Sequence, residues 1–161
     1  MSVQTIKGNT EVIDLGSAVV DYSQSLEEMI SHCIWAQRSP HVNSTNFPVT
    51  HGRQGAVQVA LFSIARKIPY ARILPCIRDA NCVPANLPEM LAIIASQLYL
   101  QRGFPILVID QYWNERGGIF VPCLRLPDER RHLGLYQLES SVPANFSFAV
   151  IRIPRERQLF E

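Results

Sequence analysis

The alternation of apolar and polar positions predicts a β-hairpin between residues 104 and 126. Two runs rich in β-branched and aromatic residues, 104–113 and 118–126, are separated by a short segment that closes on a pair of glycines. Glycine supplies the positive φ that tight hairpin turns need, and such runs are typical of paired strands. Two later apolar runs, 132–139 and 146–153, are predicted as further strands.

Helical periodicity occurs in other parts of the chain. Residues 25–37 begin with a serine and a glutamate three positions later, the pattern of a capping box, and continue with one apolar face. Residues 88–102 begin with proline and are apolar nearly all round, which is typical of a buried helix. Residues 54–68 alternate like a strand, but their length and their alanines favour a helix, which is our prediction. Residues 70–77 are predicted as a short strand.

These elements predict an α+β fold, with an antiparallel sheet of four or more strands and about three helices packed on it, the 88–102 helix among them. The chain has 161 residues, of which 47% are hydrophobic. A chain of this length buries roughly 70% of its unfolded surface in one core. We therefore expect residues 1–161 to form a single α+β domain.

Charge and hydropathy narrow the classes of partner. The formal net charge is +1, and acidic and basic residues are interspersed along the chain. This balance argues against nucleic-acid binding, which needs a positive field to release counterions from phosphates. No apolar run approaches the roughly 18 residues of a membrane span, and residues 1–10 contain no apolar signal core. We expect a cytoplasmic protein whose high apolar content is covered in part by a protein partner or by self-association.

A cysteine and a histidine are the best candidates for catalysis. Cys82 precedes the predicted 88–102 helix, where backbone amides and the helix dipole lower a thiol pKa, and His132 begins a strand and would act as its base. Residues 82–87, Cys-Val-Pro-Ala-Asn-Leu, resemble the nucleophile segment of papain-like bacterial peptidases, although those families place glycine after the cysteine. The resemblance implies a hydrolase or acyl transferase, with Asn145 as the late residue available to orient the histidine. An inert loop thiol is the alternative.

The segment 39–53 is predicted as a long loop, because it contains two prolines and many turn-forming residues without any periodic pattern. Connections of this length are uncommon in compact domains and are often functional. His41, His51 and Arg53 are candidate binding residues, since their side chains donate hydrogen bonds to an anion or to an acidic group of a partner. An ordinary solvated loop is the alternative.

Neither a metal nor a cofactor is predicted. Cys76 and Cys82 have no matching second pair, whereas structural zinc sites combine closely spaced ligands. The leading hypothesis is a non-enzymatic interaction, assembly or adaptor protein that acts through a protein partner. The alternatives are a small cysteine hydrolase or acyl transferase that uses Cys82 and His132, and a regulatory domain that binds a small molecule between the helices and the sheet.

Overall fold

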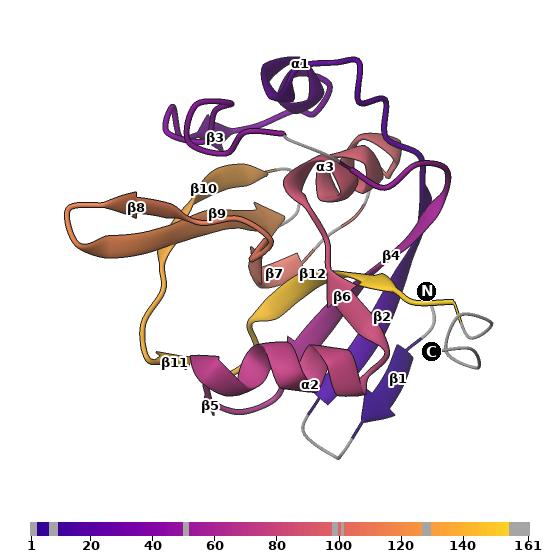
Figure 1. The fold of residues 1–161 in the computed structure, drawn as a ribbon, viewed down its shortest axis with the longest axis vertical. Coiled ribbons are helices and arrows are strands. Elements are labelled where there is room, and N and C mark those ends of the chain that lie inside the picture. The colour runs from indigo at the N-terminus through magenta and orange to yellow at the C-terminus, as the bar shows by residue number, and fades with distance from the viewer. Residues whose placement is uncertain are drawn as a thin grey trace.

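A mixed sheet of ten strands carries helices on both faces in the computed structural model of the protein (Figure 1). The structure describes residues 3–6, 10–49, 52–97, 100, 102–126 and 130–154. The strands of the sheet are β1 (Val3–Ile6), β2 (Thr10–Ala18), β3 (Gln37–Arg38), β4 (Val57–Ile64), β6 (Cys82–Pro84), β7 (Arg102–Leu107), β8 (Trp113–Glu115), β9 (Gly118–Leu126), β10 (His132–Gln137) and β12 (Ser147–Arg152). The other elements are α1 (Leu26–Ser31), β5 (Ile68–Pro69), the 3-10 helix η1 (Tyr70–Arg72), α2 (Ile73–Asp79), α3 (Leu87–Ser96) and β11 (Ser141–Val142), which pairs with β5.

The strand order across the sheet is β1-β2-β4-β12-β7-β9-β10-β3, with β6 beside β12 and β8 beside β9. Neighbouring strands are antiparallel except for two pairs, β12 with β7 and β10 with β3, which are parallel. The α+β arrangement agrees with the prediction, but the purely antiparallel sheet was wrong. Hairpin signals reveal only consecutive strands, whereas parallel neighbours are joined by long crossover connections that no local pattern marks.

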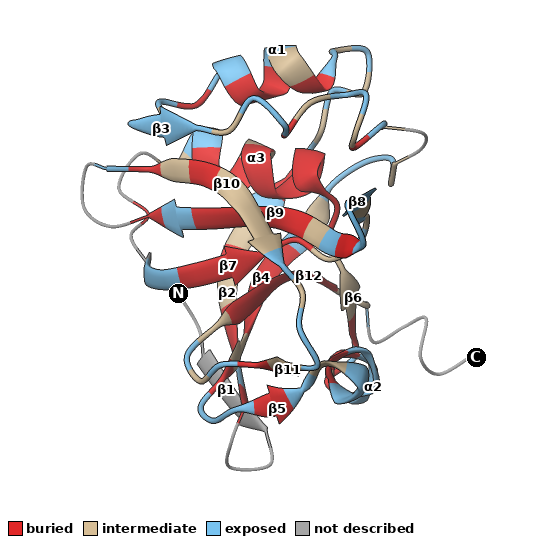
Figure 2. Cartoon of the chain, turned by 90° about the vertical axis from the view of Figure 1, so that its left-hand side faces the viewer, coloured by how far each residue is buried: buried red, intermediate tan, exposed pale blue. Residues whose placement is uncertain are grey.

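Alternate residues of the central strands enter two separate cores. On one face Ile13, Leu61 and Ala149 pack with the apolar residues of α1 and α3. On the other face Phe62 and Phe148 pack with α2, β5 and β11. Figure 2 shows the central strands as a buried layer between these two sets of elements. Strands covered on both faces have no polar side, so their sequences read as nearly continuous apolar runs.

This burial on both faces explains why the helix predicted for 54–68 was wrong. The segment forms β4, which pairs antiparallel with β2 along one edge and with β12 along the other. Residues 59–62 are all fully buried, so no polar face interrupts the run. Without that alternation, length and alanine content favoured a helix, although the β-branched residues are typical of a central strand.

The strand predicted for 70–77 was also wrong, because this segment forms η1 and α2. Pro75 is the third residue of α2, in the first turn, where a backbone N–H has no partner inside the helix. Ile73 and Ile77 are four residues apart and are both buried against the sheet. Pro75 therefore lies at the start of a helix, where proline is tolerated, and not in an edge strand.

Both capped helices begin as predicted and end earlier. Ser25 and Glu28 form the expected capping box of α1, but the helix ends at Ser31, and the indole of Trp35 donates a hydrogen bond to the carbonyl of Ile30 in its last turn. Helix α3 ends at Ser96 rather than at 102, since the next residue leaves the helical conformation. The side chain of that residue, Gln97, donates instead to a β2 carbonyl.

The predicted hairpin is confirmed in its pairing. Strands β7 and β9 are antiparallel neighbours, and β8 pairs with the first residues of β9 through a turn at Arg116 and Gly117, which both have positive φ. The runs at 132–139 and 146–153 form β10 and β12. Strand β10 follows β9 as an antiparallel neighbour, whereas β12 is inserted between β4 and β7 at the centre of the sheet.

Replacement of a central core residue should test this arrangement. Phe148→Ala should lower the free energy of unfolding by about 3–5 kcal/mol, because Phe148 is fully buried on the α2 side of β12 and its removal leaves a cavity. Phe104→Ala is the matched control, since Phe104 is 57% exposed on β7 and its loss should cost about 0.5 kcal/mol or less. Urea denaturation of both variants measures the difference. Equal losses would contradict the position of β12.

Candidate functional site

Three strands at one end of the sheet, β3, β10 and β9, form the floor of a hollow in the surface. In the register of these strands Gln37 of β3, His132 of β10 and Arg125 of β9 are direct neighbours on one face. This is the face that α2 covers elsewhere, because Cys123 and Tyr136 belong to the α2-side core. Strands β9 and β10 extend this face of the sheet past the part that α2 covers (Figures 1 and 2).

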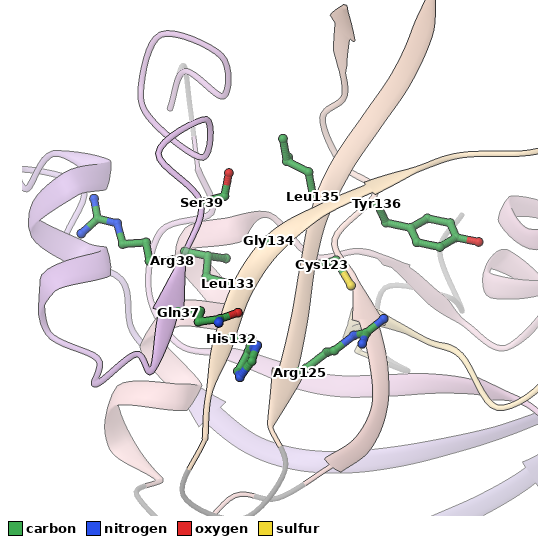
Figure 3. A pocket seen from close by; sticks show the side chains of 10 residues that line it. All are labelled: Gln37, Arg38, Ser39, Cys123, Arg125, His132, Leu133, Gly134, Leu135 and Tyr136. Carbon is green, nitrogen blue, oxygen red and sulfur yellow. The ribbon is translucent and has the colours of Figure 1, made fainter.

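The hollow exists because the next row of side chains is small. Gly134 lies opposite Cys123, and the backbone N–H of Ser39 donates to the carbonyl of Leu133, which continues the β3 pairing by one residue. A Cβ atom built on Gly134 would meet nothing within 4 Å. The resulting cavity is open to solvent and has a volume of about 530 Å³. We call it the Gly134 hollow. It is lined by Gln37, Arg38, Ser39, Cys123, Arg125, His132, Leu133, Gly134, Leu135 and Tyr136 (Figure 3).

The charged groups around the Gly134 hollow are basic. Arg125 lies two residues after Cys123 on β9, and its guanidinium is close enough to the Cys123 thiol to affect the pKa of that thiol. Burial raises the pKa of the Cys123 thiol, and the guanidinium partly offsets that effect. Arg38 extends away from the hollow towards α1 in Figure 3. Among the described residues no carboxylate lines the hollow, so its field favours negatively charged or polar occupants.

The Gly134 hollow opens onto a free strand edge. Backbone N–H and C=O groups of alternate residues point to opposite sides of a strand. The carbonyls of Arg131 and Leu133 accept hydrogen bonds from the β3 segment, whereas the N–H of Leu138 donates towards β9. The backbone groups of Leu135 and Gln137 therefore face the side on which β3 has already ended. No described strand pairs with them there. We call this the free β10 edge.

A second polar cluster lies at the start of α3. Asn86 caps the helix and forms a capping box with Glu89, whose carboxylate is fully buried. Arg53 donates from Nη1 to Oε1 of Glu89 at 2.7 Å, and the amide of Asn86 donates to the phenol oxygen of Tyr22. Oε2 of Glu89 is buried without a hydrogen-bond partner among the described atoms. A Cβ atom at Gly52 would lie 1.9 Å from the Tyr22 ring, so glycine is needed there.

The structure separates two of the three binding residues proposed for the 39–53 loop, His41 and Arg53. The ring of His41 stacks on Trp113 of β8, with centroids 5.4 Å apart. Arg53 binds Glu89 at the start of α3. His51 lies outside the described residues. The two described side chains thus attach the loop to two different elements, β8 and α3.

The two proposed catalytic residues occupy different surroundings. Cys82 is on β6, beside Arg152 of β12, and its side chain is fully buried. Burial raises the pKa of the Cys82 thiol to about 11, which disfavours the thiolate. His132 lines the Gly134 hollow, and the cysteine that shares this hollow is Cys123. Asn145 has positive φ in the turn before β12, and its N–H donates to β4.

The residues that form the hollow were not among the sequence candidates, apart from His132. A single glycine inside the strand run His-Leu-Gly-Leu-Tyr-Gln is a recognised sign of a close approach or an unfilled position, and it was the available signal for Gly134. Gln37 carried no signal, because its position depends on a parallel pairing between distant segments. The role of Glu89 could not be predicted for a similar reason, because its ion-pair partner, Arg53, belongs to the distant long loop.

No protein-family model, curated protein or solved structure matches the chain. None of the described helices is both long enough and apolar enough to cross a membrane. The described residues also contain no cluster of three or more histidine, cysteine, aspartate or glutamate side chains that could hold a metal ion.

Removal of Arg53 should destabilise the fold. Arg53→Ala should lower the free energy of unfolding by about 2–3 kcal/mol, because the buried Glu89 carboxylate loses its cation. The loss is moderate because the Arg53 side chain is 38% exposed, so water already screens the ion pair in the native protein. Chemical denaturation measures the loss, and Arg66→Ala, an exposed arginine after β4, is the control. The double variant Arg53→Ala with Glu89→Gln should recover part of the loss. An unchanged stability in Arg53→Ala would contradict the ion pair.

Alkylation should show that Cys82 is unreactive in the folded protein. Two pKa units above the ordinary value of 9.0 mean about a hundredfold less thiolate at pH 8, and burial excludes the reagent as well. Iodoacetamide should therefore modify Cys82 at least about a hundredfold more slowly in the native protein than in concentrated urea, as measured by mass spectrometry of its peptide. Equal rates would restore Cys82 as a nucleophile.

The raised pKa of Cys82 should also make the stability of the fold depend on pH. Because the pKa of Cys82 is raised in the folded state, the neutral thiol stabilises the fold fully below pH 9. That contribution is lost as the pH rises from 9 towards 11. The free energy of unfolding of the native sequence should fall more steeply over this window than that of Cys82→Ala.

Proposed function

We propose that the chain is a non-enzymatic interaction protein that binds an extended segment of a partner protein as an added strand on the free β10 edge. The observation that carries this proposal is the combination of that edge with the Gly134 hollow beside it. Added strands gain affinity from main-chain hydrogen bonds and specificity from cavities that receive alternate side chains. Both features occur side by side at β10.

Pairing within the chain supports strand addition at this place. Strand β3 is itself a short segment that pairs with β10 through Gln37 and Arg38, far from β10 in the sequence. It covers only the first residues of β10 and leaves Leu135 and Gln137 unpaired on that side. A partner segment would continue in the line of β3 and use the same edge.

The composition of this edge supports the proposal as well. Natural proteins protect exposed edge strands with proline, charged residues or bulges, which block pairing with other chains. Residues 134–137 read Gly-Leu-Tyr-Gln and contain neither proline nor a charge. The register of β10 against β9 is continuous, without a bulge. The strand is thus suited to pairing along its free side.

The side chains at Cys82 and at the Gly134 hollow favour binding over catalysis. Cys82 is buried with a raised thiol pKa, and the groups at the hollow are hydrogen-bond donors and aromatic surface rather than an activated nucleophile with a base. The four cysteines, Cys33, Cys76, Cys82 and Cys123, are free. Free thiols are typical of a reducing compartment, which supports a cytoplasmic site of action.

A backbone substitution at Gln137 tests strand addition directly. A random peptide library displayed on phage is selected on the native protein, and the affinity of an enriched synthetic peptide is then measured by calorimetry. Gln137→Pro should weaken this peptide by at least about tenfold, because proline removes an edge N–H and its ring blocks the added strand. Gln137→Ala is the matched control, since it removes the same side chain but keeps the N–H, and should bind like the native protein.

Three results would contradict the proposal. The library yields no peptide that binds above the blank support, or the selected peptide binds Gln137→Pro as well as the native protein. Alternatively, light scattering shows a dimer that Gln137→Pro dissociates, which would assign the free β10 edge to a second copy of this chain. Unchanged thermal unfolding of both variants shows that they are folded.

A further inference from the structure

We infer that a second cavity, between the 39–53 loop and the start of α3, binds a small organic amine that has an apolar body and an ammonium group. The cavity has a volume of about 200 Å³, and Pro48 and Asp110 are among the residues that line it. We call it the Pro48 cavity. It is separate from the free β10 edge, so this inference goes beyond strand addition and stands or falls independently of it.

The floor of the Pro48 cavity is apolar and buried. Phe47 of the loop, Leu87 of α3 and Val108 just after β7 line it, and all three belong to the core on the α1 and α3 face. Pro122 of β9 lies opposite Leu135, one position away from the pair of Gly134 and Cys123, so it faces the other side of the sheet from the Gly134 hollow. Ligand cavities in proteins are typically apolar in this way, with a few polar groups that fix the orientation of the ligand.

The loop wall of the Pro48 cavity is held in place at several points. The side-chain amide of Gln111 donates to the carbonyl of Pro48 at 2.7 Å, which joins the loop to the segment after β7. On either side of this contact, His41 stacks on β8 and Arg53 is bound at the start of α3. A cavity whose walls are already fixed loses little conformational entropy when a ligand binds. The long loop is therefore ordered around an unfilled space, as is typical of binding loops.

The polar groups of the Pro48 cavity are mainly hydrogen-bond acceptors. Asp110 is the one charged side chain among its described lining residues, and it forms no ion pair with any of the described residues. Donors are few, because three of the lining residues are prolines, which have no N–H. In the first turn of α3 the N–H of Glu89 already donates to Asn86 at 2.8 Å. A free carboxylate in these surroundings favours an ammonium group, which donates charge-assisted hydrogen bonds.

The order of apolar and polar groups along the Pro48 cavity determines the kind of amine. Asp110 is exposed, whereas Phe47 and Val108 are buried, so the carboxylate lies at the mouth and the apolar surface lies at the floor. A lysine or arginine side chain of a partner would enter with its charge first and leave that charge on the apolar floor, which is costly. A free amine can instead enter with its apolar end first. An apolar cavity of about 150 Å³ binds benzene, so the Pro48 cavity has room for one aromatic ring with a short chain.

Two compounds of nearly equal shape and one pair of variants test the inference. Phenethylamine and phenethyl alcohol are titrated into the native protein, and the amide resonances of the lining residues are followed by NMR. The amine should bind about fivefold more tightly than the alcohol, the factor expected for an ion pair near the surface. Asp110→Asn should bind both compounds equally. Glu11→Gln is the matched control, because it removes an exposed carboxylate of β2 that does not line the cavity, and it should keep the preference.

A third variant tests the position of the ligand. Val49 is a half-buried residue of the loop that lines the cavity, so Val49→Phe should fill the space and prevent both compounds from binding, while thermal unfolding shows that the variant is folded. Absence of saturable shifts at the lining residues, or equal affinities of the native protein for both compounds, would overturn the inference. It would also be overturned by a preference that survives in Asp110→Asn, by one that is lost in Glu11→Gln, or by undiminished binding to folded Val49→Phe.

Discussion

Strand β12 is the element on which the rest of the structure depends. It pairs with β4 along one edge and with β6 and β7 along the other, and residues 147–151 are all buried. Strand β4 connects β12 to the N-terminal strands β1 and β2, and β7 connects β12 to β9 and β10. Its alternate side chains also contribute to both cores. The site at β10 is therefore positioned by a strand that lies well away from it in the sheet.

The position of the site follows from the shape of the two layers. Helices α1 and α3 cover one face of the sheet, whereas the opposite face is covered by α2 with the small β5–β11 pair (Figure 1). The layer made by α2 and the β5–β11 pair is shorter than the sheet is wide. Strands β9, β10 and β3, at one end of the sheet, therefore present polar and small residues on that face. The hollow lies at this uncovered end, and Cys123 and Tyr136 connect it to the core on the α2 side.

Local signals in the sequence predicted the elements that local interactions determine. The capping box of α1, made by Ser25 and Glu28, and the glycine of the β8–β9 turn act within a few residues, so both were predicted correctly. Strand β4 and helix α2 were misassigned because burial on two faces and a proline in a first helical turn have no distinct local pattern. Of the residues that line the candidate site, only His132 was singled out in the sequence, and there as a catalytic base for Cys82. The other members of the site meet through pairings between distant segments, which hydrophobic periodicity does not encode.

The central place of β12 also bears on how the protein is made. Strands β4 and β7 leave the ribosome before β12 does. Until β12 arrives, β4 exposes an unpaired, largely apolar edge along residues 59–63, and β7 exposes a shorter one at Ile106 and Leu107. Unpaired strand edges of this type are the usual starting points of aggregation during synthesis. Closure of the sheet must therefore wait until residue 152 has emerged. Incomplete chains that stop before β12 should depend on chaperones, however well their N-terminal hairpin is formed.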